Sequence, residues 1–452
     1  MIILHKPTIV TAEKEAVGTI IIEDGLISDI LYSDAEDYGF RIDRIFKTNP
    51  EAQIHDLEGK HVIAGGIDAH VHFREPGLTH KADIHSESRA AIAGGVTTVF
   101  DMPNTVPPTV TSEALKEKIE IAKSSSAAKI GFHFGATNSN TDLVRKLITE
   151  GDEVNGVSPA DIAGIKVFMG SSTGNMLVDN GSSLDDLFSI KEKPVLVHCE
   201  DEATIKANLD AAVGKYGDDI PFTEHENIRS RRACIKSSIK ALEMAMKHGT
   251  RLTLCHISTK EEIEMVRAAK INNPDITAET SCNYLWFCNE DYNRLGSRAK
   301  CNPSIKTADD RAALRNALAE GLIDTIGSDH APHLPQEKEA FYTKAPSGLP
   351  SIQQSLPVLL TIAHEDDIPL TRIAAVFSEN ASRTYGLDRG IIKPGFKADL
   401  VIFDNHVDFV VRNEDQYSKC GWTPYEGTTL RGRIESVLID GQTVFRDGKV
   451  IL

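Results

Sequence analysis

Residues 61–72 read HVIAGGIDAHVH, an apolar run that ends in two histidines separated by one residue. Seven further apolar segments follow it along the chain, at 96–103, 129–137, 162–169, 194–200, 251–258, 275–281 and 324–330. Several are nearly continuous runs of Val, Ile and Leu, as expected for parallel strands that are covered on both faces. The intervening segments show helical spacing of apolar residues, and the one at 111–123 begins with a capping Thr. The alternation predicts an α/β fold built on a (β/α)8 TIM-like barrel.

The two ends of the chain have a different pattern. Residues 1–32 alternate between apolar and polar side chains, and the C-terminal segment does the same. Asp-Gly pairs, which are typical of hairpin turns, lie at 24–25, 440–441 and 447–448. We therefore expect both chain ends to pair into one small β-sandwich domain. The predicted boundaries are 1–60 and 391–452 for this domain and 61–390 for the barrel.

Composition limits the classes of protein. Of the 452 residues, 41% are hydrophobic and 25% are charged, which is enough for a large core. The formal net charge of −17 argues against a nucleic-acid partner and against an anionic membrane. No stretch approaches the ~20 apolar residues that span a bilayer, and the N-terminus lacks a secretory signal pattern. Seven scattered cysteines without a CxxC pair indicate reduced thiols, so we expect a cytoplasmic protein.

Residues that can bind metal stand at the ends of the predicted strands. His70 and His72 lie two residues apart, which places both imidazoles on one face of the first strand. His198, His256 and Asp329 end three later strands. Any one of these histidines alone is compatible with a hydrogen-bonded core residue or a surface coincidence. Together, at one end of one barrel, they predict a site for zinc or a related divalent ion.

Lys166 ends the predicted strand at 162–169, among apolar residues. A buried lysine is costly, so its ammonium either reaches water, pairs with an acid, or has been chemically changed. The amine can react with carbon dioxide to give a carbamate, whose two oxygens can bridge two metals. Because an ammonium would repel both ions, the carbamate suits this position better.

These residues and their order resemble the amidohydrolase superfamily, and the similarity runs over most of the chain. DAHVHFREPG (68–77), DMPNT (101–105) and SDHAPH (328–333) resemble the dihydroorotases, one group of its cyclic amidases. GIIKPGFKADLVIFD (390–404) is similar to the segment in which such enzymes leave the barrel and return to the β domain.

The resemblance implies two Zn2+ or similar divalent ions in each subunit. His70, His72 and Asp329 would hold the first ion, and His198 and His256 the second. Lys166 would bridge them as N6-carboxylysine. Asp329 would also be the catalytic residue that moves the proton.

The resemblance also implies residues that bind substrate. Arg74, Asn104 and His333 would bind a carboxylate, Asn302 would contact the ring, and Gly348 lies in a late loop that reaches the substrate in relatives. A guanidinium binds a carboxylate bidentately, which suits Arg74. Other roles stay open: a rim salt bridge for Arg74, a loop cap for Asn104 and a loop contact for His333.

The implied activity is the reversible hydrolysis of (S)-dihydroorotate to N-carbamoyl-L-aspartate, a step of pyrimidine biosynthesis, by hydroxide on two metals. The partner would be this small anionic substrate, and a homodimer is left open. The closest alternatives are an allantoinase and a dihydropyrimidinase or hydantoinase, whose uncharged substrates would leave Arg74 without a partner. A catalytically silent scaffold homologue is a more remote alternative.

Three features depart from the family pattern or stay open. Asn283 stands where relatives often have a histidine. Cys255 and Glu279 are compatible with a third metal, as in some relatives, but the sequence favours a buried neutral thiol for Cys255. The segment 170–177 is either a lid over the substrate or an ordinary loop.

Overall fold

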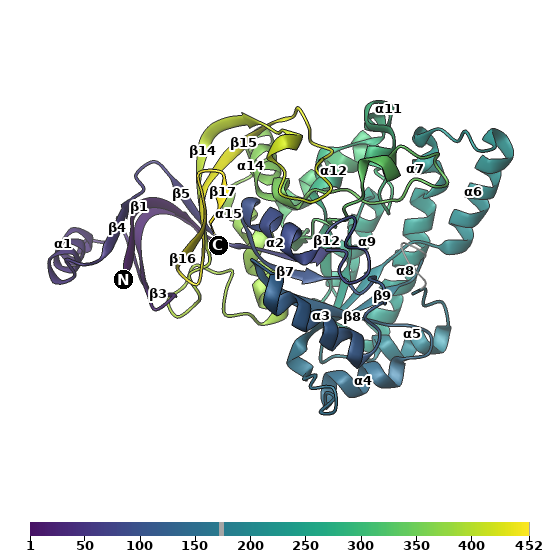
Figure 1. Cartoon of the computed structure of the whole chain (residues 1–452), viewed down its shortest axis with the longest axis horizontal. Helices are drawn as coiled ribbons and strands as arrows, with labels where there is room; N and C mark the ends of the chain where they lie inside the picture. Colours follow the sequence, from purple (N-terminus) through teal and green to yellow (C-terminus); the bar gives the residue numbers. More distant parts are fainter. Residues whose placement is uncertain (171–175, 452) are drawn as a thin grey trace.

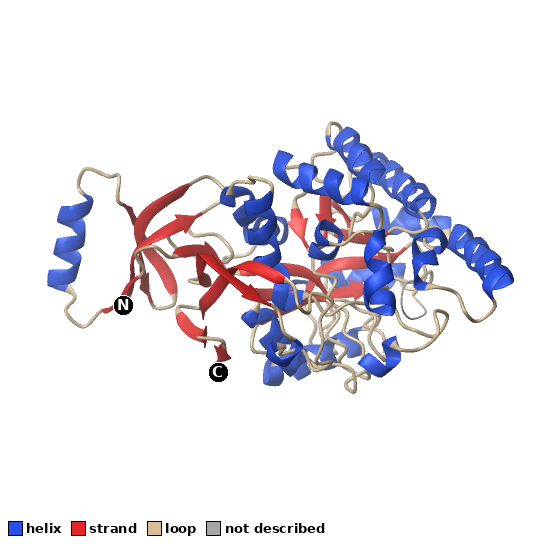
Figure 2. Cartoon of the chain, turned by 90° about the horizontal axis from the view of Figure 1, so that it is seen from above, coloured by secondary structure: helices blue, strands red, loops and turns tan. Residues whose placement is uncertain are grey.

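The computed structural model describes residues 1–170 and 176–451. In Figures 1 and 2, a sheet built from both chain ends occupies one end of the molecule, and a barrel surrounded by helices occupies the other. The predicted (β/α)8 barrel and the sheet formed by both chain ends are confirmed.

The barrel is a parallel sheet of eight strands in which each strand pairs with the next one along the chain. Its strands are β6 (Gly66–Val71), β7 (Val96–Asp101), β8 (Lys129–Gly135), β9 (Ile162–Phe168), β10 (Val195–His198), β11 (Leu252–Leu254), β12 (Thr277–Thr280) and β13 (Thr325–Ile326). A parallel bridge between Val71 and His330 brings the segment after β13 back to β6. The ring of strands therefore gathers their carboxyl ends at one mouth, where barrel enzymes place their chemistry.

Helices cover the outside of the barrel (Figure 1). The main ones are α2 (Ile84–Ala93), α3 (Ser112–Ser125), α4 (Thr141–Thr149), α5 (Gly181–Phe188), α6 (Glu202–Tyr216), α8 (Arg231–His248), α9 (Lys260–Lys270), α12 (Ala308–Glu320) and α14 (Ser355–Glu365). Shorter helices include α10 (Cys282–Trp286), α13 (Pro335–Lys338), α15 (Leu370–Ala374) and α16 (Asn380–Tyr385). Thr111, Thr259 and Thr307 each accept a backbone N–H of the first turn, which explains why α3, α9 and α12 begin where they do.

The terminal sheet contains nine strands from the two chain ends. They are β1 (Ile2–Val10), β2 (Glu15–Glu23), β3 (Leu26–Tyr32), β4 (Gln53–Asp56), β5 (His61–Ala64), β14 (Leu400–Val410), β15 (Thr429–Ile439), β16 (Gln442–Arg446) and β17 (Lys449–Val450). β5 pairs with β1 on one side and with β14 on the other, so it joins the N-terminal strands to the C-terminal ones. The Asp-Gly pairs at 24–25, 440–441 and 447–448 have positive φ at both residues and form the predicted hairpin turns.

The single strand expected over residues 61–72 was wrong, because this run forms two strands. β5 belongs to the terminal sheet and β6 to the barrel. Between them the backbone passes very close to its neighbours: a Cβ added at Gly65 would lie 2.3 Å from Thr97 Oγ1, and one at Gly66 would lie 2.4 Å from Phe377 Cζ. Only glycine fits such contacts, and the uninterrupted apolar run hides the change of sheet. The domain boundaries at 60 and 390 stay predictions.

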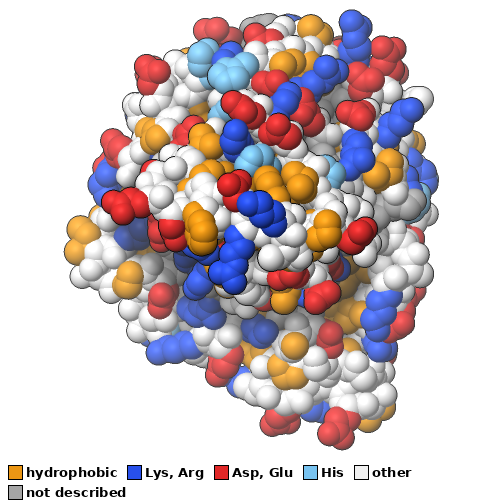
Figure 3. Space-filling model, turned by 90° about the vertical axis from the view of Figure 1, so that its left-hand side faces the viewer, with side chains coloured by type: hydrophobic (Ala, Val, Ile, Leu, Met, Phe, Trp, Pro, Cys, Tyr) orange, Lys and Arg blue, Asp and Glu red, His pale blue; other side chains and the backbone are white. Residues whose placement is uncertain are grey.

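Three further facts concern the surface, the helices and the cysteines. On the face of the terminal sheet shown in Figure 3, acidic and basic side chains are intermingled. Among the described residues, every helix is too short or too polar to traverse a lipid bilayer. All seven cysteines are buried free thiols, as the sequence predicts.

Candidate active site

The barrel brings all five predicted histidine and aspartate ligands to its mouth. His70 lies in β6 and His72 directly after it, His198 is the last residue of β10, His256 follows β11, and Asp329 follows β13. The four histidines are buried. His256 and Asp329 have φ of 42° and 49°, in the left-handed region that side chains other than glycine rarely adopt. Such strain persists where the surroundings fix a residue for a task.

His70, His72 and Asp329 form the first cluster. Asp329 Oδ1 lies 3.0 Å from His72 Nε2 and 3.5 Å from His70 Nε2. One ligand atom from each of the three residues lies within 4.8 Å of the others. Burial alone would raise the pKa of Asp329, but His70 and His72 outweigh it and hold that pKa below its ordinary value. The cluster therefore offers a carboxylate and two ring nitrogens.

His198 and His256 form the second cluster. His198 Nδ1 and His256 Nε2 lie 2.9 Å apart, and the two rings meet edge to face. Burial lowers the pKa of both imidazoles, and that of His256 falls well below its ordinary value with help from His198, His70 and Lys166. The ring centroid of His70 is 5.3 Å from that of His256, so the two clusters are adjacent.

Further side chains orient the histidines that are predicted to bind metal. Glu279 Oε1 lies 2.7 Å from His70 Nδ1, and Asn104 Oδ1 lies 2.7 Å from His72 Nδ1. Both rings therefore turn Nε2 toward Asp329, the usual way in which outer partners fix a ligand tautomer. Asn104, which was expected at a substrate carboxylate, thus contacts His72 through its amide oxygen.

Glu200 is a residue that the sequence analysis missed. It is fully buried, and its Oε2 lies 3.0 Å from His198 Nε2 and 3.3 Å from Arg229 Nη1. Arg229 and the contact with His198 overcome the effect of burial and lower the pKa of Glu200 to about 2. An anion behind His198 favours Nδ1 as the nitrogen that faces the site. The only signal in the sequence was its position two residues after the strand-ending histidine.

Lys166 points into the same centre from β9. Its side chain is fully buried, with Nζ 3.3 Å from Cys255 Sγ. In the described part of the chain no carboxylate lies within 4.0 Å of Nζ. The Lys166 ammonium therefore neither reaches solvent nor pairs with an acid of the described chain. A buried cation without an anion is unfavourable, whereas a carbamate would have the opposite charge.

Arg74 and His333 line the side of the mouth next to the first cluster. Arg74 is 4% exposed and has a φ of 67°. Its Nε donates to Pro332 O, and its Nη2 lies 3.0 Å from His333 Nε2. Burial lowers the pKa of Arg74 to about 10, so the guanidinium remains charged at neutral pH. Among the described residues no carboxylate lies within 4.0 Å of it.

Of the remaining positions, Asn302 and Gly348 lie in loops and Asn283 lies in α10. Gly348 has a φ of 143°, and a Cβ there would lie 2.5 Å from Ala331 O and 3.0 Å from His333 Cδ2, so only glycine fits. The Asn302 side-chain oxygen is buried and has no hydrogen-bond partner among the described residues. Asn283 is held between Tyr425, Ser351 and the carbonyl of Ser328. The segment 170–177, for which a lid and an ordinary loop were both left open, falls largely on 171–175, outside the described residues.

The model of the amidohydrolase family matches residues 61–444, a range that includes every predicted ligand. The chain belongs to the amidohydrolase family.

Similar proteins act on several rings. The chain is 34% identical over 399 residues to a dihydroorotase of Methanosarcina acetivorans, covering 86% of this chain and 82% of that one. It is 29% identical over 456 residues to an allantoinase of Desulfitobacterium hafniense, covering 96% and 95%. Among solved structures, the L-hydantoinase (dihydropyrimidinase) of Arthrobacter aurescens has a TM-score of 0.88 at 26% identity, covering 100% of this chain and 97% of that one. Enzymatic function within the amidohydrolase family is supported, and the names differ in the substrate.

The amidohydrolase centre has a donor set that fits divalent ions. Neutral imidazoles and a carboxylate are the groups that Zn2+ binds. The two adjacent pairs of imidazoles, His70 with His72 and His198 with His256, match two neighbouring ions. A second group of donors, formed by His70, Cys255 and Glu279, lies next to it. Burial raises the pKa of the Cys255 thiol well above its ordinary value, so without an ion this sulfur is neutral.

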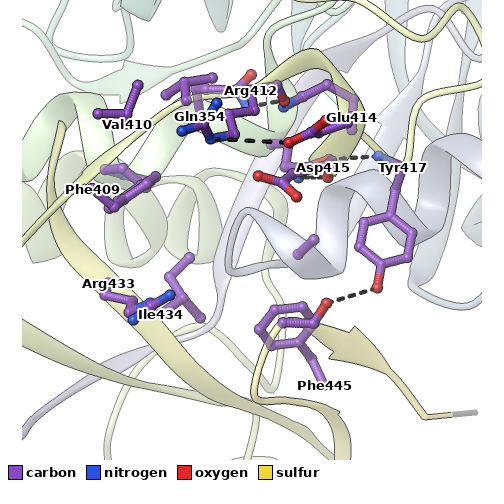
Figure 4. A pocket seen from close by; sticks show the side chains of 16 residues that line it. Gln354, Phe409, Val410, Arg412, Glu414, Asp415, Tyr417, Arg433, Ile434 and Phe445 are labelled. Carbon is purple, nitrogen blue, oxygen red and sulfur yellow. Dashed lines mark hydrogen bonds and ion pairs between the residues drawn. The ribbon is translucent and has the colours of Figure 1, made fainter. Parts of the chain in front are cut away.

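A groove of about 440 Å³ lies away from this centre, between α14 and the terminal sheet (Figure 4). Gln354, Phe409, Arg412, Tyr417 and Phe445 are among its lining residues, and the Tyr417 hydroxyl donates to Gly448 O. None of the predicted site residues lines it.

Proposed function

We propose that this amidohydrolase is a dihydroorotase, which reversibly hydrolyses (S)-dihydroorotate to N-carbamoyl-L-aspartate in pyrimidine biosynthesis. The observation that carries the proposal is Arg74, a buried guanidinium beside the metal-type cluster with no carboxylate partner in the described chain. A charge that is buried and unpaired destabilises a protein, so such an arrangement is typical of a site that receives its counter-ion from a ligand. Relatives named dihydroorotase, at 34% and 33% identity, support the same function.

The substrate carboxylate distinguishes this proposal from its alternatives. Dihydroorotate has a carboxylate on its ring, whereas dihydrouracil, hydantoin and allantoin have none. A guanidinium binds a carboxylate through two parallel hydrogen bonds, and the preference is lost when the anion is absent. Arg74 and His333 together would select the charged ring.

We further propose that two divalent ions, Zn2+ or similar, occupy the two clusters, with Lys166 as N6-carboxylysine between them. When bound, these ions supply Lewis acidity that activates water near neutral pH and polarises the amide carbonyl.

The residues of the chain position the ring and move the proton. Arg74 and His333 bind the carboxylate, while Asn302 and Gly348 border the ring. Asp329, whose low pKa keeps it ionised, accepts the proton of the attacking water and delivers it to the ring nitrogen that leaves. In ring closure the same carboxylate takes the proton from that nitrogen.

The test is a comparison of dihydroorotate, dihydrouracil, hydantoin and allantoin with purified, zinc-loaded enzyme. We expect strong preference for dihydroorotate, and we expect Arg74→Ala to remove that preference. Arg412→Ala, an arginine of the distant groove, is the matched control. Equal or faster turnover of an uncharged ring would favour an allantoinase or hydantoinase, and no turnover of any ring would favour a silent homologue.

A further inference from the structure

His333 is a buried imidazole held between two cations. Its Nδ1 lies 3.1 Å from Lys81 Nζ, and its Nε2 lies 3.0 Å from Arg74 Nη2 and 3.0 Å from Ser347 O. Burial and the nearby positive charges of Arg74, Lys338 and Lys81 lower the pKa of His333 far below its ordinary value. The ring is therefore neutral and has one N–H, on one of two nitrogens.

The neighbours favour one tautomer over the other. An Nδ1–H would point at the Lys81 ammonium, which has no acceptor, and would leave the Nε2 lone pair against Ser347 O. Only the contact with Arg74 would then be favourable. With the proton on Nε2, Nδ1 accepts from Lys81 and Nε2–H donates to Ser347 O, so only the contact with Arg74 is unfavourable. The Nε2–H tautomer has two favourable contacts and the Nδ1–H tautomer has one, so the surroundings favour Nε2–H.

We infer that Lys81 is a positioning residue for anion recognition, because it holds His333 as the Nε2–H tautomer. In this form the ring cannot accept from Arg74 Nη2. His333 Nε2–H donates to Ser347 O, so the N–H of Arg74 Nη2 that faces the ring is left to an outside acceptor, and a carboxylate oxygen provides one. This inference rests on the proposed function for the identity of the anion.

Lys81 is well placed to act on the ring. Its Nζ forms an ion pair with Glu337 Oε1 at 2.8 Å, and its side chain is 14% exposed. The other oxygen of Glu337 accepts from Leu334 N and lies 3.8 Å from His333 Nδ1. Without the lysine, Nδ1–H would therefore have Glu337 as its acceptor, and Arg74 would donate to Nε2. Arg74 Nη2 would then have an acceptor within the chain, and it would no longer need a substrate oxygen.

The kinetic test uses Lys81→Met in the full-length, zinc-loaded enzyme. We expect KM for dihydroorotate to rise about tenfold or more, since one hydrogen bond to a charged group is lost, with kcat nearly unchanged. Lys81→Arg, which retains a cationic donor, should restore most of the affinity. Lys419→Met is the control. Lys419 Nζ donates to Thr79 O and Asp83 Oδ2, so it contacts the segment around Lys81 without contacting His333.

A spectroscopic test is independent of the substrate. The nitrogen shifts of His333 in protein labelled with 15N-histidine, assigned with His333→Gln, report which ring nitrogen has the proton. We expect Nε2–H in the wild type and in Lys81→Arg, and Nδ1–H in Lys81→Met. An Nδ1–H wild type, a Lys81→Met ring that keeps Nε2–H, or an unchanged KM in Lys81→Met overturns the inference. If the shifts agree but dihydroorotate is not hydrolysed, the tautomer assignment stands and the proposed function fails.

Discussion

Nδ1 of His198 and Nε2 of His256 lie 2.9 Å apart at the mouth of the barrel, although 58 positions separate the two residues in the chain. Since burial keeps both imidazoles neutral, the two facing nitrogens can serve one ion. We expect His256→Ala to reduce the metal content from about two ions per chain to about one. Elemental analysis of the dialysed protein measures this content. His364→Ala, which removes an exposed imidazole, is the control, and an unchanged metal content in His256→Ala would exclude the second cluster as a ligand pair.

Lys166→Met should prevent loading of the metal centre. The substitution keeps the shape of a long apolar side chain but removes the amine that carbon dioxide would modify. We expect activity to fall by at least about a hundredfold, because loss of a charged group at a metal site affects both binding and chemistry. Lys166→Glu, which supplies a carboxylate, should recover part of the metal content. If the wild type takes up the same amount of metal with and without added bicarbonate, and Lys166→Met does too, the bridging carbamate is ruled out.

Lys118 and Asp101 form a buried ion pair, with Nζ 2.6 Å from Oδ2 and both side chains inaccessible to solvent. The other oxygen of Asp101 accepts from Phe73 N, directly after the predicted ligand His72. Lys118→Met would leave a buried carboxylate without its cation, so we expect the free energy of unfolding to fall by about 3–5 kcal/mol. Lys123→Met, in the exposed last turn of the same helix α3, should change it by less than about 0.5 kcal/mol. Urea unfolding of both variants gives the comparison, and similar small effects would contradict the role of the pair.

His133 should make stability depend on pH. It is buried in β8, where Nε2 donates to Ala69 O, and burial lowers its pKa to about 3. Since the unfolded histidine has a pKa near 6.5, protonation of the unfolded chain lowers the free energy of unfolding as pH falls from about 6.5 toward 3. His133→Gln keeps an N–H donor but cannot bind the proton. Its stability should therefore decline less steeply than that of the wild type, by up to about 1.4 kcal/mol per pH unit. Parallel slopes in urea unfolding between pH 6.5 and 5 would show that His133 is not responsible.

The sequence predicts the barrel and its metal-type residues well because both follow from local patterns. Apolar runs that alternate with capped helices specify parallel strands, and the carboxyl ends of parallel strands meet at one mouth. His70, His198 and Asp329 could therefore be placed near one another without a structure. The ligand roles themselves remain predictions until metal content is measured.

The parts that the sequence did not reveal depend on contacts between distant segments. Lys81 lies 252 positions before His333, and nothing in its own segment indicates that its Nζ meets an imidazole. Glu200 is near His198 in the chain, but its burial against Arg229 is visible only in three dimensions. The change of sheet at Gly65 depends on how closely Thr97 approaches, which an apolar run cannot show.

The position of β5 has a consequence for how the protein is made. β5 lies between β1 and β14, and the chain passes from it through Gly65 directly into β6, which contains His70. During synthesis its partner at Leu400–Phe403 leaves the ribosome more than three hundred residues later. The strand β6 is thus joined at its start to a sheet that stays incomplete until almost the whole chain has been made. The C-terminal strands complete this sheet last, so a barrel without both chain ends would lose the sheet that supports β6 and the predicted metal site.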